Sequence, residues 1–247
     1  METLQVLLTY FGRVLPGVVL LGALVAIFRW SPAIRIVLYI ALFVLFRDAM
    51  TPLGLWRFGA IDGVFWIRLS EDAWFLVAFG LASAGLVAAA IVFDRETGRL
   101  VRFRRGSLPR GIAVGVGAAI LVVVPPAIAY RFVPVDLRGG NVVTQLLPAI
   151  LVFALLGNLF EELLFRGYVV GALEPRYGAI RAGVLSGFVF AGCHVFLALT
   201  VTDVGVPLLL FTVWEGVIAG LVGGRYGVVP ATLTHGGAIF LLSSGLI

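Results

Sequence analysis

Long apolar runs are the feature of this chain that most constrains its fold. Eight stretches are predominantly apolar, and several reach the roughly 20 residues that a helix needs to cross a hydrocarbon core about 30 Å thick. The runs cover residues 14–28, 33–46, 73–93, 111–129, 142–165, 182–200, 205–223 and 228–247. Because backbone groups in lipid must satisfy one another, these runs predict an all-α, polytopic membrane protein with about eight transmembrane helices.

The composition excludes the soluble alternatives. Hydrophobic residues make up 61% of the 247 positions and charged residues 13%, which is more apolar surface than a water-soluble core of this size can bury. A soluble nucleotide-binding domain, a disordered chain and a disulfide scaffold are therefore excluded, and Cys193 is the sole cysteine. We expect residues 1–247 to form a single integral membrane domain, a multi-pass protein of the cell membrane with the lipid bilayer as its surroundings.

The basic residues indicate topology rather than nucleic-acid binding. All 18 of them are arginine, and most lie between apolar runs, as topology determinants do. Six arginines in residues 94–110 predict a cytoplasmic loop. Alternating outward from this loop predicts that both termini lie on the opposite side of the membrane. The same alternation places five further arginines on the cytoplasmic side: Arg29, Arg35, Arg176, Arg181 and Arg225.

Glycines recur at four-residue spacing in the sixth and seventh runs. Gly183 and Gly187 lie in the sixth run, Gly216 and Gly220 lie in the seventh, and Gly224 directly follows the seventh. Such spacing places small residues on one helix face and predicts closely packed helices.

Ionisable residues inside the fifth run are the first sign of chemistry, because each costs about 2.5–3.5 kcal/mol at the centre of a membrane helix. Glu162 and Arg166 are four residues apart, so they stack on one helix face and can neutralise each other. Glu161 has no basic residue three or four positions away and is predicted to be the unpaired carboxyl, suited to a general base. The structural alternative is a helix end at the interface, where both acids are hydrated.

The only two histidines, His194 and His235, fall in the middle of predicted spans and have small neighbours. Two histidines and two glutamates at matching depth on three helices predict one polar cluster, because buried ionisable groups in membranes pair with one another. Glu215 is interpreted as a structural partner for a polar group elsewhere.

Other peptidase and nucleotide motifs are absent from the sequence. It contains no His-Glu-x-x-His, no Gly-x-Ser-x-Gly and no glycine-rich phosphate loop, so carboxylate and imidazole remain as the reactive groups. We expect no cofactor. Zinc stays a possible alternative, because two histidines and a glutamate can hold it with one open position.

Three ordered motifs carry a family resemblance. Glu161-Glu162-x-x-x-Arg166, Phe190-x-x-x-His194 and a later His235 resemble the motif set of the CPBP family, which comprises CAAX-type prenyl-protein endopeptidases and bacteriocin-processing or Abi-like proteins. The resemblance covers about residues 158–239. It implies an eight-helix intramembrane endopeptidase with its active site among the last four helices, which makes residues 142–247 the catalytic half.

With this resemblance, we expect Glu161 to activate water, His194 to orient that water, and His235 to donate to the oxyanion. Four residues are expected to support them: Glu162, Arg166, Asn158 and Phe190. The expected substrate is a peptide or protein with a membrane-associated or lipidated C-terminal segment, with no nucleic acid as partner.

One position departs from the family pattern. The third motif normally ends in Asn or Asp four residues after the histidine, and here that residue is Ile239. This departure favours the alternative of a non-proteolytic immunity or scaffold protein. A transporter is disfavoured, because the ionisable residues concentrate in the C-terminal half instead of forming paired repeats.

Overall fold

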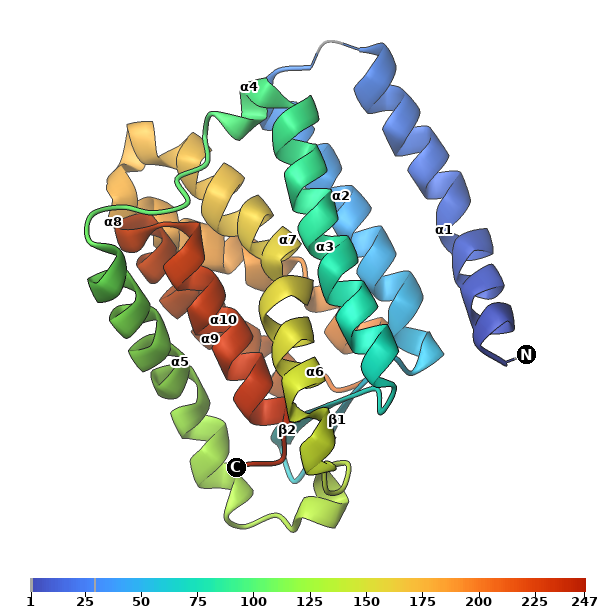
Figure 1. The fold of residues 1–247 in the computed structure, drawn as a ribbon. Helices are drawn as coiled ribbons and strands as arrows, with labels where there is room; N and C mark the ends of the chain where they lie inside the picture. The colour runs from blue at the N-terminus through green and yellow to red at the C-terminus, as the bar shows by residue number, and fades with distance from the viewer. Residues whose placement is uncertain (1, 29) are drawn as a thin grey trace.

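The computed structural model describes residues 2–28 and 30–247 as a helical bundle with one β-hairpin (Figure 1). Arg29 lies outside the described residues. The N-terminal half contains α1 (Glu2–Ile27), α2 (Pro32–Met50), β1 (Trp56–Ile61), β2 (Val64–Leu69), α3 (Ala73–Phe93), α4 (Arg95–Gly98) and α5 (Leu108–Tyr130). The C-terminal half contains α6 (Leu147–Val152), α7 (Leu159–Glu162), α8 (Val170–Gly192), α9 (Val206–Tyr226) and α10 (Val228–Ser243). The predicted all-α, polytopic membrane class is confirmed.

Four helical segments of the described chain are long and apolar enough to cross a membrane: Ala73–Phe93, Leu108–Tyr130, Thr144–Val201 and Val206–Tyr226. The third has 58 residues and is broken at Gly178, where φ is 74°, so it is much longer than one crossing requires. Phe11–Ile27 and Val228–Ser243 are shorter apolar helices. These lengths support several crossings, and the predicted number of eight is not established by them.

The arginine-rich loop and the two termini lie at opposite ends of the bundle (Figure 1). Backbone hydrogen bonds join this loop to the junction of α9 and α10, from Arg105 N to Tyr226 O at 2.8 Å and from Val228 N to Arg102 O at 2.9 Å. The guanidinium of Arg105 also pairs with both carboxylate oxygens of Glu174 at 2.5 Å. The arginine-rich loop and the segments around Glu174 and Tyr226 are thus grouped at one end.

The β-hairpin was not predicted from the sequence. Its turn is Asp62–Gly63, with φ values of 49° and 76°, between the paired residues Ile61 and Val64. An Asp-Gly pair with two positive φ angles is the preferred two-residue hairpin turn, so the signal was present. The hairpin closes the bundle at the end opposite the arginine-rich loop (Figure 1).

Helices α8 and α9 pack in direct backbone contact. A methyl group on Gly183 would collide with the backbone of Gly220, and one on Gly187 would collide with the backbone of Gly216. This contact bears out the close packing predicted from the glycine spacing. It also brings Glu215 of α9 next to the end of α8 that carries Phe190.

Asp94, at the end of α3, joins three elements. Its carboxylate accepts hydrogen bonds from Arg35 Nη1 at 2.7 Å, Tyr39 OH at 2.8 Å and Thr97 Oγ1 at 2.7 Å. Burial by itself would raise the pKa of Asp94, but the hydrogen bonds from Thr97 and Tyr39 and the charge of Arg35 lower it below its usual value. The ionised carboxylate therefore stabilises the contact between α2 and α3.

We predict that Asp94→Asn lowers the free energy of unfolding by about 1.5–3 kcal/mol at neutral pH, because charge-assisted hydrogen bonds are lost. A carboxyl with a depressed folded pKa stabilises the fold above its unfolded pKa of about 3.9 and loses this effect as the pH falls through the folded value. Unfolding in detergent between pH 7 and pH 3 should show the two proteins converging. Asp136→Asn, at an exposed carboxyl, serves as control, and an Asp94→Asn difference that does not shrink with acid would contradict the prediction.

Candidate active site

Irregular helical turns position the glutamate pair. The π-helical segment η4 (Phe153–Gly157) precedes Asn158, and a second, η5 (Leu163–Val169), follows Glu162 directly. A third π-helical segment, η6 (Leu197–Val201), begins three residues after His194. Single π-turns are uncommon and often occur at functional sites, because the extra residue per turn redirects neighbouring side chains.

Glu162 is the buried anchor of the site and is 0% exposed. Its Oε1 accepts a hydrogen bond from Arg166 Nη1 at 2.8 Å and another from His235 Nδ1 at 2.8 Å. Arg166 also donates to the carbonyl of Gly216 on α9 at 3.3 Å. The ion pair predicted between Glu162 and Arg166 is therefore present, and it extends to α9 and α10.

Glu161 differs from its neighbour in both partners and access. Among the described residues no side-chain or backbone group forms a hydrogen bond with its carboxylate, and 8% of the residue remains exposed. Its Oε2 lies 3.8 Å from His235 Nε2, which is longer than a hydrogen bond. Glu161 is thus the carboxyl that is free to hold a water.

His235 lies between three carboxylates. Its Nδ1 donates to Glu162, while its Nε2 is 3.8 Å from Glu161 Oε2 and 3.9 Å from Glu215 Oε1. Glu215 is 1% exposed, and its Oε1 has no hydrogen-bond partner among the described residues. The sequence interpretation treated Glu215 as a structural partner for a polar group elsewhere, and the polar group that the structure places beside it is His235.

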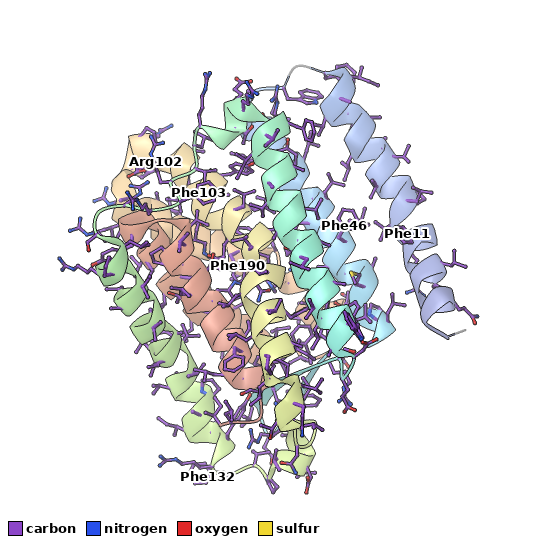
Figure 2. All side chains as sticks on the ribbon, viewed as in Figure 1. Phe11, Phe46, Arg102, Phe103, Phe132 and Phe190 are labelled. Atoms are coloured by element: carbon purple, nitrogen blue, oxygen red, sulfur yellow. The ribbon has the colours of Figure 1, made fainter. Side chains whose placement is uncertain are left out.

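His194 lies close to the same site, because it contacts Phe190 and Phe190 also contacts His235. Its Nδ1 is 2.8 Å from the carbonyl oxygen of Phe190; because a carbonyl only accepts, Nδ1 carries the hydrogen and Nε2 of the neutral ring is an acceptor. The Phe190 ring centroid is 4.5 Å from the His194 ring and 5.5 Å from the His235 ring. Figure 2 shows Phe190 inside the bundle, between the loop marked by Arg102 and the end marked by Phe132.

Two further charged residues near the site were missed by the sequence analysis. Arg47 of α2 donates from Nη2 to the carbonyl of Cys193 at 2.7 Å and pairs with Asp48 at 2.8 Å, and both side chains are 8% exposed. The predicted second span ended at residue 46, one position before them. A basic-acidic pair directly after an apolar run was the available signal.

Two positions bear on the supply of hydrogen-bond donors at the site: Asn158, a predicted supporting residue, and Ile239, which stands where the family pattern has Asn or Asp. Asn158 donates one amide hydrogen to the carbonyl of Ala154 at 2.8 Å, which leaves its second hydrogen available. Ile239 is buried and apolar, so it provides no donor one turn after His235.

A metal centre requires at least three converging ligands in most protein sites. Within residues 2–28 and 30–247, no group of three His, Cys, Asp or Glu side chains is arranged to hold a metal ion.

Together these features define a polytopic helical membrane protein with a buried carboxylate–imidazole cluster. Residues 143–241 match the family model described as Rce1-like, type II CAAX prenyl endopeptidase Rce1-like. The matched segment contains all three motifs, and the family resemblance that they carry is confirmed for this part of the chain. No curated protein and no solved structure matches the chain significantly.

We predict that the two adjacent glutamates differ sharply in their effect on stability. Glu162→Gln should lower the free energy of unfolding by about 3–5 kcal/mol, because it leaves the buried charge of Arg166 uncompensated. Glu161→Gln should change it by less than about 1 kcal/mol, because no hydrogen bond to a described residue is lost. Thermal unfolding of the two variants in the same detergent tests this, and equal losses would contradict the different partners of the two carboxylates.

Proposed function

We propose that this protein is an intramembrane endopeptidase in which Glu161 activates a water molecule. The observation that carries the proposal is a carboxylate inside the bundle that is partly exposed, has no hydrogen bond to the described chain, and lies 3.8 Å from a ring nitrogen of His235. The match of residues 143–241 to a family described as endopeptidases supports the same reaction class.

In the first step, a water is held between the Glu161 carboxylate and the acceptor nitrogen Nε2 of His194. Glu161 takes one proton as the water oxygen forms a bond to the peptide carbonyl carbon, and the carbonyl π electrons move to the oxygen. In the second step, the protonated Glu161 gives its proton to the amide nitrogen as the C–N bond breaks. The products are a carboxylic acid and an amine, and the Glu161 carboxylate is regenerated.

His235 is proposed to stabilise the oxyanion of the tetrahedral intermediate. Its Nδ1 hydrogen is already donated to Glu162, so the oxyanion donor is an Nε2 hydrogen. One preorganised donor of this kind is worth about 2.7–4 kcal/mol in a water-excluded site. Glu162 and Arg166 act by fixing the ring of His235 in position.

The proposed substrate is a peptide or protein whose C-terminal segment is lipidated or membrane-associated, as in CAAX-type processing or the removal of a C-terminal sorting tail. An open cavity of about 560 Å³ supports this class. Its lining is mostly apolar and comes from α2 and from the segment just after His194, namely Ala41, Val44, Leu45, Asp48, Ala49 and Phe196. Asp48, in this lining, is next to Arg47, and Arg47 donates to the carbonyl of Cys193, the residue before His194. An apolar anchor in this cavity would therefore place the adjoining peptide near the site.

A non-proteolytic immunity or scaffold protein of the same family is the second candidate. It is favoured by Ile239, a side chain without a donor at the position where the family pattern has Asn or Asp. The two candidates differ in whether the wild-type protein cleaves a peptide bond at all.

We predict that Glu161→Gln reduces cleavage by about 10²–10⁴-fold without loss of fold, because the amide cannot accept the proton. The measurement is mass spectrometry of a farnesylated CAAX-tail peptide and of a membrane-anchored sorting-tail peptide incubated with protein in liposomes. Glu71→Gln, at an exposed carboxyl outside the cluster, is the matched control and should cleave at the wild-type rate. Wild-type cleavage by Glu161→Gln would refute the proposed base, and a wild-type protein inert on both peptides would favour the non-proteolytic candidate.

We further predict that cleavage survives prolonged dialysis against a chelator and that the purified protein holds no stoichiometric zinc. A three-ligand zinc site would lose its metal under these conditions and regain activity on addition of Zn²⁺. Loss of cleavage that equimolar Zn²⁺ restores would change the roles of Glu161, His194 and His235 from acid–base groups to ligands. Metal analysis before and after dialysis is the direct readout.

A further inference from the structure

Three arginines lie close together at the end of the bundle that carries the hairpin, outside the carboxylate–imidazole cluster. Arg57 of β1 and Arg68 of β2 are direct partners in the antiparallel register, so their side chains leave the same face of the hairpin. Arg138 follows α5, and its charge reaches Arg68. Like charges directly opposite each other on two strands are destabilising. The hairpin therefore carries an electrostatic cost that the described chain does not offset.

The guanidinium of Arg68 is buried without an acidic partner. Arg68 is 2% exposed, and it donates from Nε to Gly140 O at 3.1 Å and from Nη1 to the carbonyls of Ile67 and Leu242 at 2.9 Å. Its Nη2 has no partner, and none of the described acids forms an ion pair with it. Burial lowers the pKa of Arg68 below its usual value; Tyr130 opposes this effect, and the positive charges of Arg138 and Arg57 add to it. The side chain thus has both an unused donor and an uncompensated charge.

A small cavity adjoins this side chain. It measures about 20 Å³, and its lining includes Arg57, Arg68, Gly139, Asn141 and Ser243. This volume accommodates roughly one water-sized particle. Glu71 also contributes to the lining, but it is exposed and forms no ion pair with either arginine within the described ranges.

The loop that closes the cavity is shaped around Arg68. Gly139 and Gly140 both have positive φ angles, 84° and 82°, a conformation that side chains other than glycine rarely adopt. A Cβ atom on Gly139 would lie 2.6 Å from the Arg68 side chain. The close approach of this backbone leaves space for one small group beside the guanidinium and excludes a larger side chain of the protein itself.

We propose that this cavity is a binding site for a phosphate group, which inserts one anionic oxygen between Arg57 and Arg68. A water could satisfy the free Nη2 donor, but only an anion also offsets the paired positive charges. The planar fork of arginine donors matches phosphate oxygens in geometry. The site lies at the hairpin end of the bundle, opposite the arginine-rich loop (Figure 1), and two sources can supply the phosphate, a phospholipid headgroup or free phosphate. This inference does not depend on the proposed peptidase activity.

The test uses the full-length protein, lipid-depleted in an uncharged maltoside detergent and in buffer free of phosphate and chloride. Three probes are titrated separately: inorganic phosphate, phosphatidylglycerol, and a diacylglycerol with the same acyl chains but no phosphate. The unfolding midpoint reports binding, because a ligand that binds only the folded state raises it with concentration. Native mass spectrometry reports how many probe molecules stay bound.

For wild type we expect phosphate or phosphatidylglycerol to raise the midpoint and diacylglycerol to have no effect. Stabilisation by phosphate identifies a free-anion site, and stabilisation by the phospholipid alone identifies a headgroup site; both support the proposal. Arg57→Gln should weaken the effective probe about tenfold or more, since one charged hydrogen bond is lost. Arg57 is exposed, so this variant should fold even if Arg68→Met does not. Arg131→Gln, exposed at the same end but outside the cavity lining, should bind like wild type.

Three results would overturn the proposal. In the first, neither phosphate-bearing probe stabilises the protein. In the second, phosphatidylglycerol and diacylglycerol stabilise it equally. In the third, Arg57→Gln binds the probe with wild-type affinity.

Discussion

A single buried carboxylate, that of Glu162, holds the polar centre of this protein together. Its Oε1 accepts from both Arg166 and His235, and Arg166 continues to the backbone of α9. In a bundle surrounded by hydrocarbon, none of these charged groups can be hydrated as in water, so each depends on the others. Because Arg166 and His235 both bind Glu162, its neighbour Glu161 is left without a hydrogen-bond partner among the described residues. One glutamate thus holds the polar centre together, and the other is the base of the proposed mechanism.

The helices around this centre deviate from regular geometry where the reactive side chains are placed. Two π-helical segments enclose the Glu161–Glu162 turn, and a third follows His194. Close backbone contact between α8 and α9 brings Glu215 and Phe190 to the same place. Phe190 then separates the two imidazole rings while contacting both. The site is therefore built from irregular turns and small residues rather than from one rigid helix face.

Arginine has three different uses in this chain. Loop arginines such as Arg105 hold one end of the bundle, where the guanidinium pairs with Glu174. Arg166 neutralises a buried acid inside the site. Arg68 is the exception, because its bonds go only to neutral carbonyls. In the first two uses, an acidic side chain of the protein offsets the charge of the arginine. In the third, no described acid does so, and the proposed phosphate supplies the anion.

The membrane class, the pairing of Glu162 with Arg166 and the isolated carboxyl could be predicted from the sequence, because they follow from local apolarity and from helical spacing of three or four residues. The Asp62–Gly63 turn is also visible in the sequence, as a two-residue signal beside apolar runs that indicate helices. Arg47, Glu215 and Arg68 could not be placed in the same way. Their contacts join residues far apart in the chain, such as Arg47 with Cys193 across 146 positions and Arg68 with Leu242 across 174. Whether a buried charge is neutralised or left without a counter-charge depends on which elements pack against it, and that packing exists only in the folded chain.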